Sequence, residues 1–160
     1  MTMAKSSNSR GRNKPQKLYA ECLFKRIGDG TFPGGGKAVL AALKAMGVAT
    51  NGVEPKDGSG LAHTNRLTAR ALFQCLFRYK DEPVFVEALA SGGTGTLRRR
   101  YRALGPRIRA KTGTIRGVTA LSGYVTSALG ERYVFVILAN GRSVKNARGL
   151  QNRIVGILSR

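Results

Sequence analysis

In the tripeptide Lys111-Thr112-Gly113, the first two residues have side chains suited to binding a carboxylate. A fixed ammonium group beside a hydroxyl group can hold a carboxylate by charge-assisted hydrogen bonds. Gly113 has no side chain, so a ligand could lie close against the edge of a strand there. Taken alone, the tripeptide favours a simpler interpretation, in which Lys111 and Thr112 are exposed residues of an edge strand. Whether the tripeptide binds a ligand must therefore be judged from the elements around it.

The last third of the chain predicts a sheet that would carry these residues. The pattern over 107–115 is typical of a strand, and two β-rich runs, 121–127 and 132–139, are joined by ALGE as a hairpin. A basic helix is expected over 144–158. Since helices precede this meander and a helix closes it, we expect an α+β fold with helices packed on an antiparallel sheet.

Helices are expected in the first two thirds of the chain, where apolar residues recur at helical spacing. The expected helices span 17–27, 37–46, 65–79 and 83–89. The glycine-rich segment 29–36 lacks the Lys-Ser/Thr pair of a phosphate-binding loop and is interpreted as a connector.

The third of these helices is expected to begin at an N-cap formed by Thr64 or Asn65. Its buried face is expected to consist of apolar residues at helical spacing, namely Leu67, Ala71, Leu72 and Cys75.

Length and composition indicate one globular domain, 17–160, after a polar, basic arm, 1–16, that we expect to be disordered. With 28 Lys and Arg against 8 Asp and Glu, the net charge is +20. A charge that large attracts polyanions. The alternative function is therefore a basic module that binds nucleic acid or another polyanion through Arg98-Arg99-Arg100 and Arg102. The chain has no recognisable nucleic-acid-binding signature, and the charge is equally compatible with a basic surface that has no specific partner.

Neither a metal nor a cofactor is expected. The chain has one histidine, His63, and no CxxC motif, while Cys22 and Cys75 lie in apolar helical patterns and are expected to be small buried residues. No apolar run approaches the ~20 residues that span a bilayer. The basic N-terminus has no apolar segment behind it, so the chain as written predicts a cytoplasmic location.

Longer segments carry a family resemblance. The run RAKTGTIRGVTALSGYV at 109–125, followed by YVFVILANG, resembles the penicillin-binding D-alanyl-D-alanine carboxypeptidase/endopeptidase family, the class C low-molecular-mass penicillin-binding proteins. Three upstream segments are similar to the same family: NKPQKLYAECLFKRIG at 13–28, DGSGLAHTNRLTARAL at 57–72 and ALASGGTGTLRRRYR at 88–102. The resemblance covers about 13–160 but only the later part of a family member.

The resemblance implies a serine β-lactamase/penicillin-binding-protein-like transpeptidase fold, here incomplete, and activity on peptidoglycan stem peptides. Lys111 and Thr112 would bind the substrate carboxylate, Gly113 would leave room for the substrate, and the backbone N–H of Thr114 would stabilise the oxyanion. Peptidoglycan peptides and β-lactams are the implied partners, and the implied location is periplasmic or otherwise extracytoplasmic. Asp57 to Gly60 is expected to be a structural turn near the site.

The chain departs from the family at two of its three motifs. No serine is followed at the third position by a lysine, so the nucleophile motif Ser-x-x-Lys is absent; Ser59 lacks such a lysine and is not assigned that role. Where the family has Ser-x-Asn before LYAE, this chain has Pro15-Gln16-Lys17. The triplet Ser6-Ser7-Asn8 lies too far upstream to replace it.

These departures predict a chain that is inactive alone. It would be a truncated or frameshifted gene product, one piece of a longer enzyme, or a non-catalytic partner of a full-length homologue. The sequence leaves open the preference between carboxypeptidase and endopeptidase action, and the oligomeric state.

Overall fold

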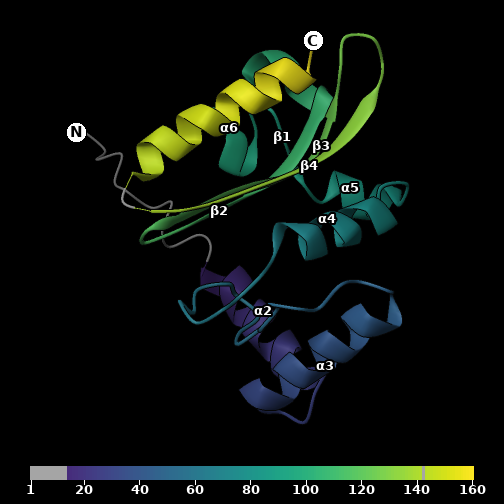
Figure 1. The fold of residues 1–160 in the computed structure, drawn as a ribbon, viewed down its shortest axis with the longest axis vertical. Coiled ribbons are helices and arrows are strands. Elements are labelled where there is room, and N and C mark those ends of the chain that lie inside the picture. Colours follow the sequence, from purple (N-terminus) through teal and green to yellow (C-terminus); the bar gives the residue numbers. More distant parts are fainter. Residues whose placement is uncertain (1–13, 142) are drawn as a thin grey trace, which may run out of the picture. The chain divides into compact units, whose positions relative to one another are not determined.

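The computed structural model describes residues 14–141 and 143–160, which form two compact units, one up to Leu67 and one from Thr68. The predicted arm lies outside the described residues, except that the first helix already begins at Lys14. Figure 1 shows the elements of both units.

The first unit is built on two helices, α2 (Lys14–Arg26) and α3 (Phe32–Ala45), which pack against each other. Phe24 of α2 is buried, as are Val48 and Val53 in the segment after α3. That segment returns through turns to an isolated bridge between Glu54 and Arg66. The small core of the first unit thus depends on the close packing of two helices and one irregular segment.

The glycine-rich segment is not the predicted connector, because its second half forms the first turns of α3. Thr31 caps the helix by accepting a hydrogen bond from the Gly34 N–H, and a proline in the first turn fits because no helical N–H is needed there. A Cβ on Gly35 would lie 2.2 Å from the Phe24 carbonyl oxygen. The glycines therefore serve the close approach of α3 to α2, a tertiary role that local propensity does not reveal.

The second unit contains a sheet of four antiparallel strands in the order β1-β2-β3-β4. Their bounds are β1 (Ala90–Ser91), β2 (Ile108–Ile115), β3 (Val118–Thr126) and β4 (Arg132–Asn140). The remaining elements are α4 (Ala69–Arg78), α5 (Pro83–Glu87), the 3₁₀ helices η1 (Gly95–Leu97) and η2 (Arg102–Arg107), and α6 (Val144–Leu158). The predicted hairpin and final helix are confirmed.

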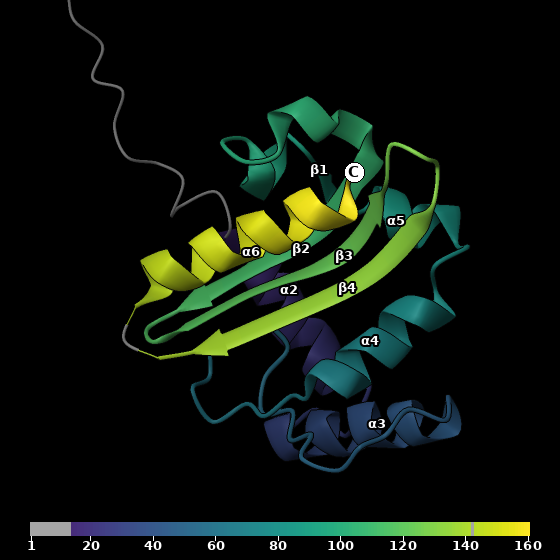
Figure 2. The same cartoon turned by 45° about the horizontal axis from the view of Figure 1, so that its top comes forward.

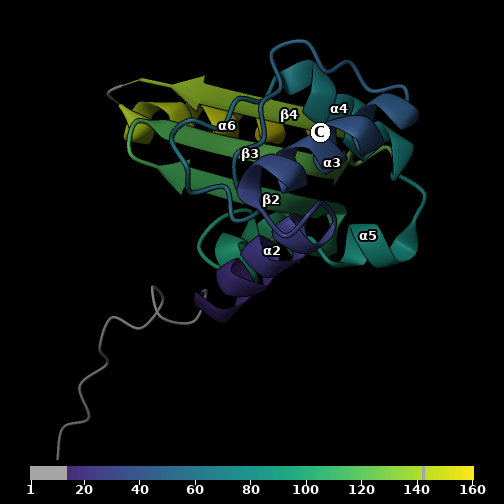
Figure 3. The ribbon, with the colours of Figure 1, turned by 90° about the horizontal axis from the view of Figure 1, so that it is seen from below.

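Helices cover both faces of this sheet. Figure 2 shows α6 lying along one face, and Figure 3 shows α4 on the opposite face. The main core lies under α6 and joins η1, the sheet and the helix through fully or almost fully buried side chains, namely Leu97, Ile108, Ala110, Leu121, Val125, Phe135 and Val155. On the other face, the Tyr124 hydroxyl donates a 2.7 Å hydrogen bond to the Leu76 carbonyl of α4. The predicted α+β architecture is confirmed.

The predicted start of the third helix is wrong. Helix α4 is capped by Thr68, whose hydroxyl accepts from the Ala71 N–H at 3.1 Å. Asn65 instead accepts a 2.7 Å hydrogen bond from the Lys56 N–H, so its side chain stabilises the preceding turn. The buried residues of α4 are Ala71 and Leu76, while Leu67 is exposed.

The two cysteines differ from each other. Cys22 is exposed, so its predicted burial is wrong, because α2 turns Phe24 rather than Cys22 toward the core of its unit. Cys75 is half-buried, and that burial raises the pKa of its thiol.

Candidate active site

The Lys-Thr-Gly tripeptide lies in the second half of β2, at an open edge of the sheet. Strand β1 pairs with only two residues of β2, Ala110 and Arg109. From Lys111 to Ile115, no other described strand pairs with the outer side of β2, while β3 pairs with its inner side along the whole strand. An edge that no further strand covers is where an extended ligand can add as another strand.

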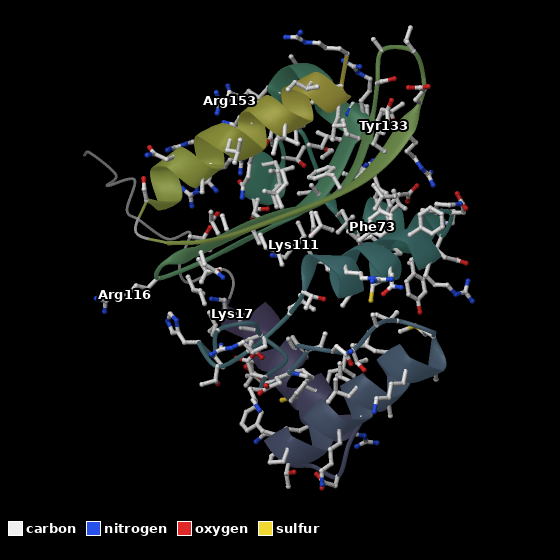
Figure 4. The ribbon with its side chains drawn as sticks, in the orientation of Figure 1. Lys17, Phe73, Lys111, Arg116, Tyr133 and Arg153 are labelled. Atoms are coloured by element: carbon white, nitrogen blue, oxygen red, sulfur yellow. The ribbon has the colours of Figure 1, made fainter. Side chains whose placement is uncertain are left out.

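The two faces of β2 present different groups at this edge. Side chains alternate along a strand, and Ile108 and Ala110 belong to the core under α6, so Thr112 and Thr114 are directed to the α6 face. Lys111 is directed to the other face, as Figure 4 shows, and its ammonium donates a 2.6 Å hydrogen bond to the Thr112 carbonyl. A ligand along the edge could therefore meet the ammonium from one face and the hydroxyls from the other.

A third group at this edge, Arg148 of α6, was missed by sequence reasoning. Its Nη2 donates a 3.1 Å hydrogen bond to the Thr114 hydroxyl, which in turn donates to the Gly113 carbonyl at 2.8 Å. The sequence gives no local signal for this contact, since the two residues are 34 positions apart. The only indication of such a contact in the sequence was that the predicted final helix is basic.

Gly113 is not required by the packing of the chain itself. A Cβ on this residue would meet only the Ala120 Cβ, at 3.4 Å, which is an ordinary contact distance. Gly123 of β3 differs, because its Cβ would lie 2.1 Å from the Arg109 carbonyl oxygen. The space beside Gly113 is consistent with the predicted approach of a ligand to the strand.

The arginine cluster that predicts polyanion binding is divided in the structure. Arg98, Arg99 and Arg100 line a cavity of about 400 Å³ together with Thr112, Thr114 and Arg148. Arg102 does not line it, and its Nε donates to the Arg98 carbonyl at 3.0 Å. Lys111 is also absent from the cavity wall.

Asp57 organises the turn that sequence reasoning assigned a structural role. Its carboxylate accepts hydrogen bonds from the N–H groups of Gly60, Leu61 and Ala62, and from the Asn65 amide at 2.8 Å. Burial raises the pKa of Asp57, but these hydrogen bonds outweigh it and bring the pKa below its ordinary value. The Ser59 hydroxyl lies 3.4 Å from the same carboxylate.

Pro15-Gln16-Lys17 falls in the first turns of α2, while Ser6-Ser7-Asn8 lies outside the described residues. Within the described ranges, no group of three or more His, Cys, Asp or Glu could hold a metal ion. Across the same ranges, every helix is too short or too polar to cross a membrane.

Comparison with known proteins identifies one family. The model of the D-Ala-D-Ala carboxypeptidase 3 (S13) family matches residues 3–160. The chain is 37% identical over 152 residues to the D-alanyl-D-alanine carboxypeptidase of an Actinomadura species, across 85% of this chain and 28% of that relative. It is 32% identical over 145 residues to the carboxypeptidase DacB of Mycolicibacterium smegmatis, across 80% of this chain and 32% of that relative. The chain thus spans about a third of the length of these relatives.

A solved structure shows the same fold. Penicillin binding protein 4 (dacB) of Haemophilus influenzae, complexed with a β-lactam, superposes with a TM-score of 0.78 at 24% sequence identity. The match covers 92% of this chain and 40% of that protein. The helices and antiparallel sheet therefore form part of a penicillin-binding-protein fold.

Proposed function

Because the chain belongs to the D-Ala-D-Ala carboxypeptidase 3 (S13) family, we propose that the open edge of β2 is the carboxylate-recognition strand of a serine-type D-Ala-D-Ala peptidase site. The observation that carries this proposal is the position of Lys111, Thr112 and Gly113 on an edge that no other described strand covers. A peptide ending in D-Ala-D-Ala would lie along this edge as an added strand.

Each residue of the edge has a role in this proposal. The Lys111 ammonium and the Thr112 hydroxyl hold the terminal carboxylate from the two faces of the strand. The backbone N–H of Thr114 faces the scissile carbonyl and stabilises its developing negative charge. Gly113 supplies the space in which the peptide backbone approaches β2, which its lack of close neighbours supports.

We further propose that the chain by itself does not hydrolyse the peptide. Its sequence contains no Ser-x-x-Lys, and Ser59 of the family-like segment 57–72 lies beside a carboxylate rather than a lysine. Without a serine activated by a neighbouring base, no acyl-enzyme forms. The chain therefore recognises the peptide end but does not hydrolyse it at a useful rate, and turnover requires a nucleophile from outside this sequence.

Ligand-observed NMR tests the recognition step. We expect N-acetyl-D-Ala-D-Ala to bind the folded chain, and the same dipeptide amidated at its C-terminus to bind about tenfold more weakly, since charge-assisted hydrogen bonds are lost. Lys111→Met should weaken binding of the acid to the level of the amide. Lys37→Met, which removes an exposed lysine of α3, is the matched control. Equal binding of acid and amide, or full binding by Lys111→Met, would contradict the proposal.

A further inference from the structure

The cavity on the α6 face of the sheet has an unusual distribution of charge. Its wall is formed by the η1 region, by β2, by β3 and by α6. Its charged residues are all arginines, namely Arg98, Arg99, Arg100 and Arg148. No Asp or Glu is among the lining residues. Among the described residues, none of these four arginines forms an ion pair. Four guanidinium charges thus meet at one hollow without compensation.

Two of these arginines are held in place by uncharged groups. Arg100 donates through Nε and Nη2 to the Asn152 Oδ1, at 3.0 and 2.7 Å, and through Nη2 to the Oε1 of the fully buried Gln151 at 3.1 Å. Its guanidinium also lies 4.9 Å from the centre of the Tyr101 ring. Arg148 is fixed by the Thr114 hydroxyl. Because neutral acceptors position these side chains, their charge remains available to a ligand.

We propose that this cavity binds a small phosphate-bearing ligand, such as a phosphate mono- or diester or a diphosphate. Guanidinium groups bind phosphate oxygens in paired hydrogen bonds, and several of them can share the oxygens of one phosphate. The Thr112 hydroxyl lines the same wall and adds a donor, while the Thr114 hydroxyl positions Arg148. A single carboxylate has one charge and would leave most of the four guanidinium charges unpaired.

The form of the cavity favours a compact ligand over a nucleic-acid strand. A volume of about 400 Å³ suits one or two phosphate groups with a small substituent. Single-stranded nucleic acid is bound along grooves in which aromatic side chains stack on successive bases. No aromatic residue lines this cavity. Binding of a polymer is therefore the competing outcome of the test, not the proposal.

Isothermal titration calorimetry with inorganic pyrophosphate, at about 0.05 M salt, where anion contacts are least screened, tests the inference on the full chain. The double variant Arg99→Gln/Arg148→Gln removes two guanidinium groups and leaves Arg100, which contacts the buried Gln151, in place. Arg153→Gln is the matched control, since Arg153 is exposed on α6 (Figure 4) and is not among the residues that line the cavity. Circular dichroism melting curves confirm that each variant is folded.

We expect the wild-type chain to bind pyrophosphate and the double variant to bind at least about tenfold more weakly, as two charge-assisted contacts are lost. Arg153→Gln should bind as the wild type does. Lys111→Met should also bind pyrophosphate normally, because Lys111 does not line the cavity. The proposed carboxylate site shares Thr112 with this cavity but depends on Lys111, so this variant distinguishes the two. Should the double variant fail to fold, Arg99→Gln alone, a change at an exposed residue, is expected to weaken binding severalfold.

Three results would overturn the inference. The folded wild-type chain could show no binding of pyrophosphate. Arg153→Gln could lose as much affinity as the double variant, which would indicate diffuse attraction to the +20 chain. A single-stranded oligonucleotide could bind far more tightly than pyrophosphate and equally to wild type and double variant, which would indicate a nucleic-acid surface elsewhere.

Discussion

The two halves of β2 have the same backbone conformation but different surroundings. In the first half, Ile108 and Ala110 are fully buried and the strand pairs with β1 and β3. In the second half, Lys111, Gly113 and Thr114 are exposed and only β3 pairs with the strand. The side chains of the first half are thus needed for the core. The exposed side chains of the second half are not needed for packing, and in our proposal they serve ligand binding. Substitutions should therefore affect stability in one half and binding in the other.

The largest loss of stability is expected from Ile108→Ala. This side chain is fully buried in the core under α6, and its truncation leaves a cavity that costs about 2–5 kcal/mol. Urea denaturation followed by circular dichroism measures the change in the free energy of unfolding. A cost below about 1 kcal/mol would mean that this half of β2 is not the anchor of the sheet.

A second large effect is expected at the neighbouring strand, from Gly123→Ala. The new methyl group would lie 2.1 Å from the Arg109 carbonyl oxygen, so β2 and β3 must move apart. Overpacking of this kind costs about 1–3 kcal/mol. The same denaturation experiment applies, and a variant as stable as the wild type would show that the contact between the strands is looser than described.

Gly113→Ala is the matched substitution in the open half, and it should spare stability. Its methyl group meets only Ala120 at 3.4 Å, so we expect a change within about 0.5 kcal/mol, as at most surface positions. Binding of N-acetyl-D-Ala-D-Ala should fall, because the methyl group occupies the space of the ligand. If this variant loses stability as Gly123→Ala does, the distinction between the two halves is wrong.

The smallest effect on stability is expected from Lys111→Met, since the side chain is exposed. The midpoint of urea denaturation should remain that of the wild type, while affinity for the acid dipeptide falls about tenfold. Thr114→Val tests the opposite face of the same edge, because it removes the acceptor of the Arg148 hydrogen bond and keeps the shape of the side chain. Loss of pyrophosphate binding without loss of dipeptide binding would sharpen the separation of the two faces.

Much of the second unit could be predicted from the sequence, because its signals are local. The alternation of apolar residues located β2 within one residue of its start, and the closing helix was placed at Val144–Leu158 as observed. The Lys-Thr-Gly tripeptide was found by residue type and setting. Local patterns do not show which side chains from distant parts of the chain come into contact. The contact of Arg148 with Thr114 was therefore missed.

The errors in the first unit have a related cause. Glycines were taken as signs of a loop, whereas Gly35 allows α3 to lie against α2 at a distance that no side chain would permit. Asn65 has the chemistry of an N-cap but serves the turn around Asp57 instead. In both cases a residue with a strong local preference is used for a tertiary contact, which cannot be read from its immediate neighbours.

The proposal that this chain recognises D-Ala-D-Ala ends without its own nucleophile is tested most directly by intact mass spectrometry. The chain, shown to be folded by circular dichroism, is incubated with excess penicillin. We predict an unmodified mass, because the sequence contains no Ser-x-x-Lys to open the β-lactam ring. A covalent penicilloyl adduct would contradict the account, and peptide mapping would then identify the residue that acts as the nucleophile.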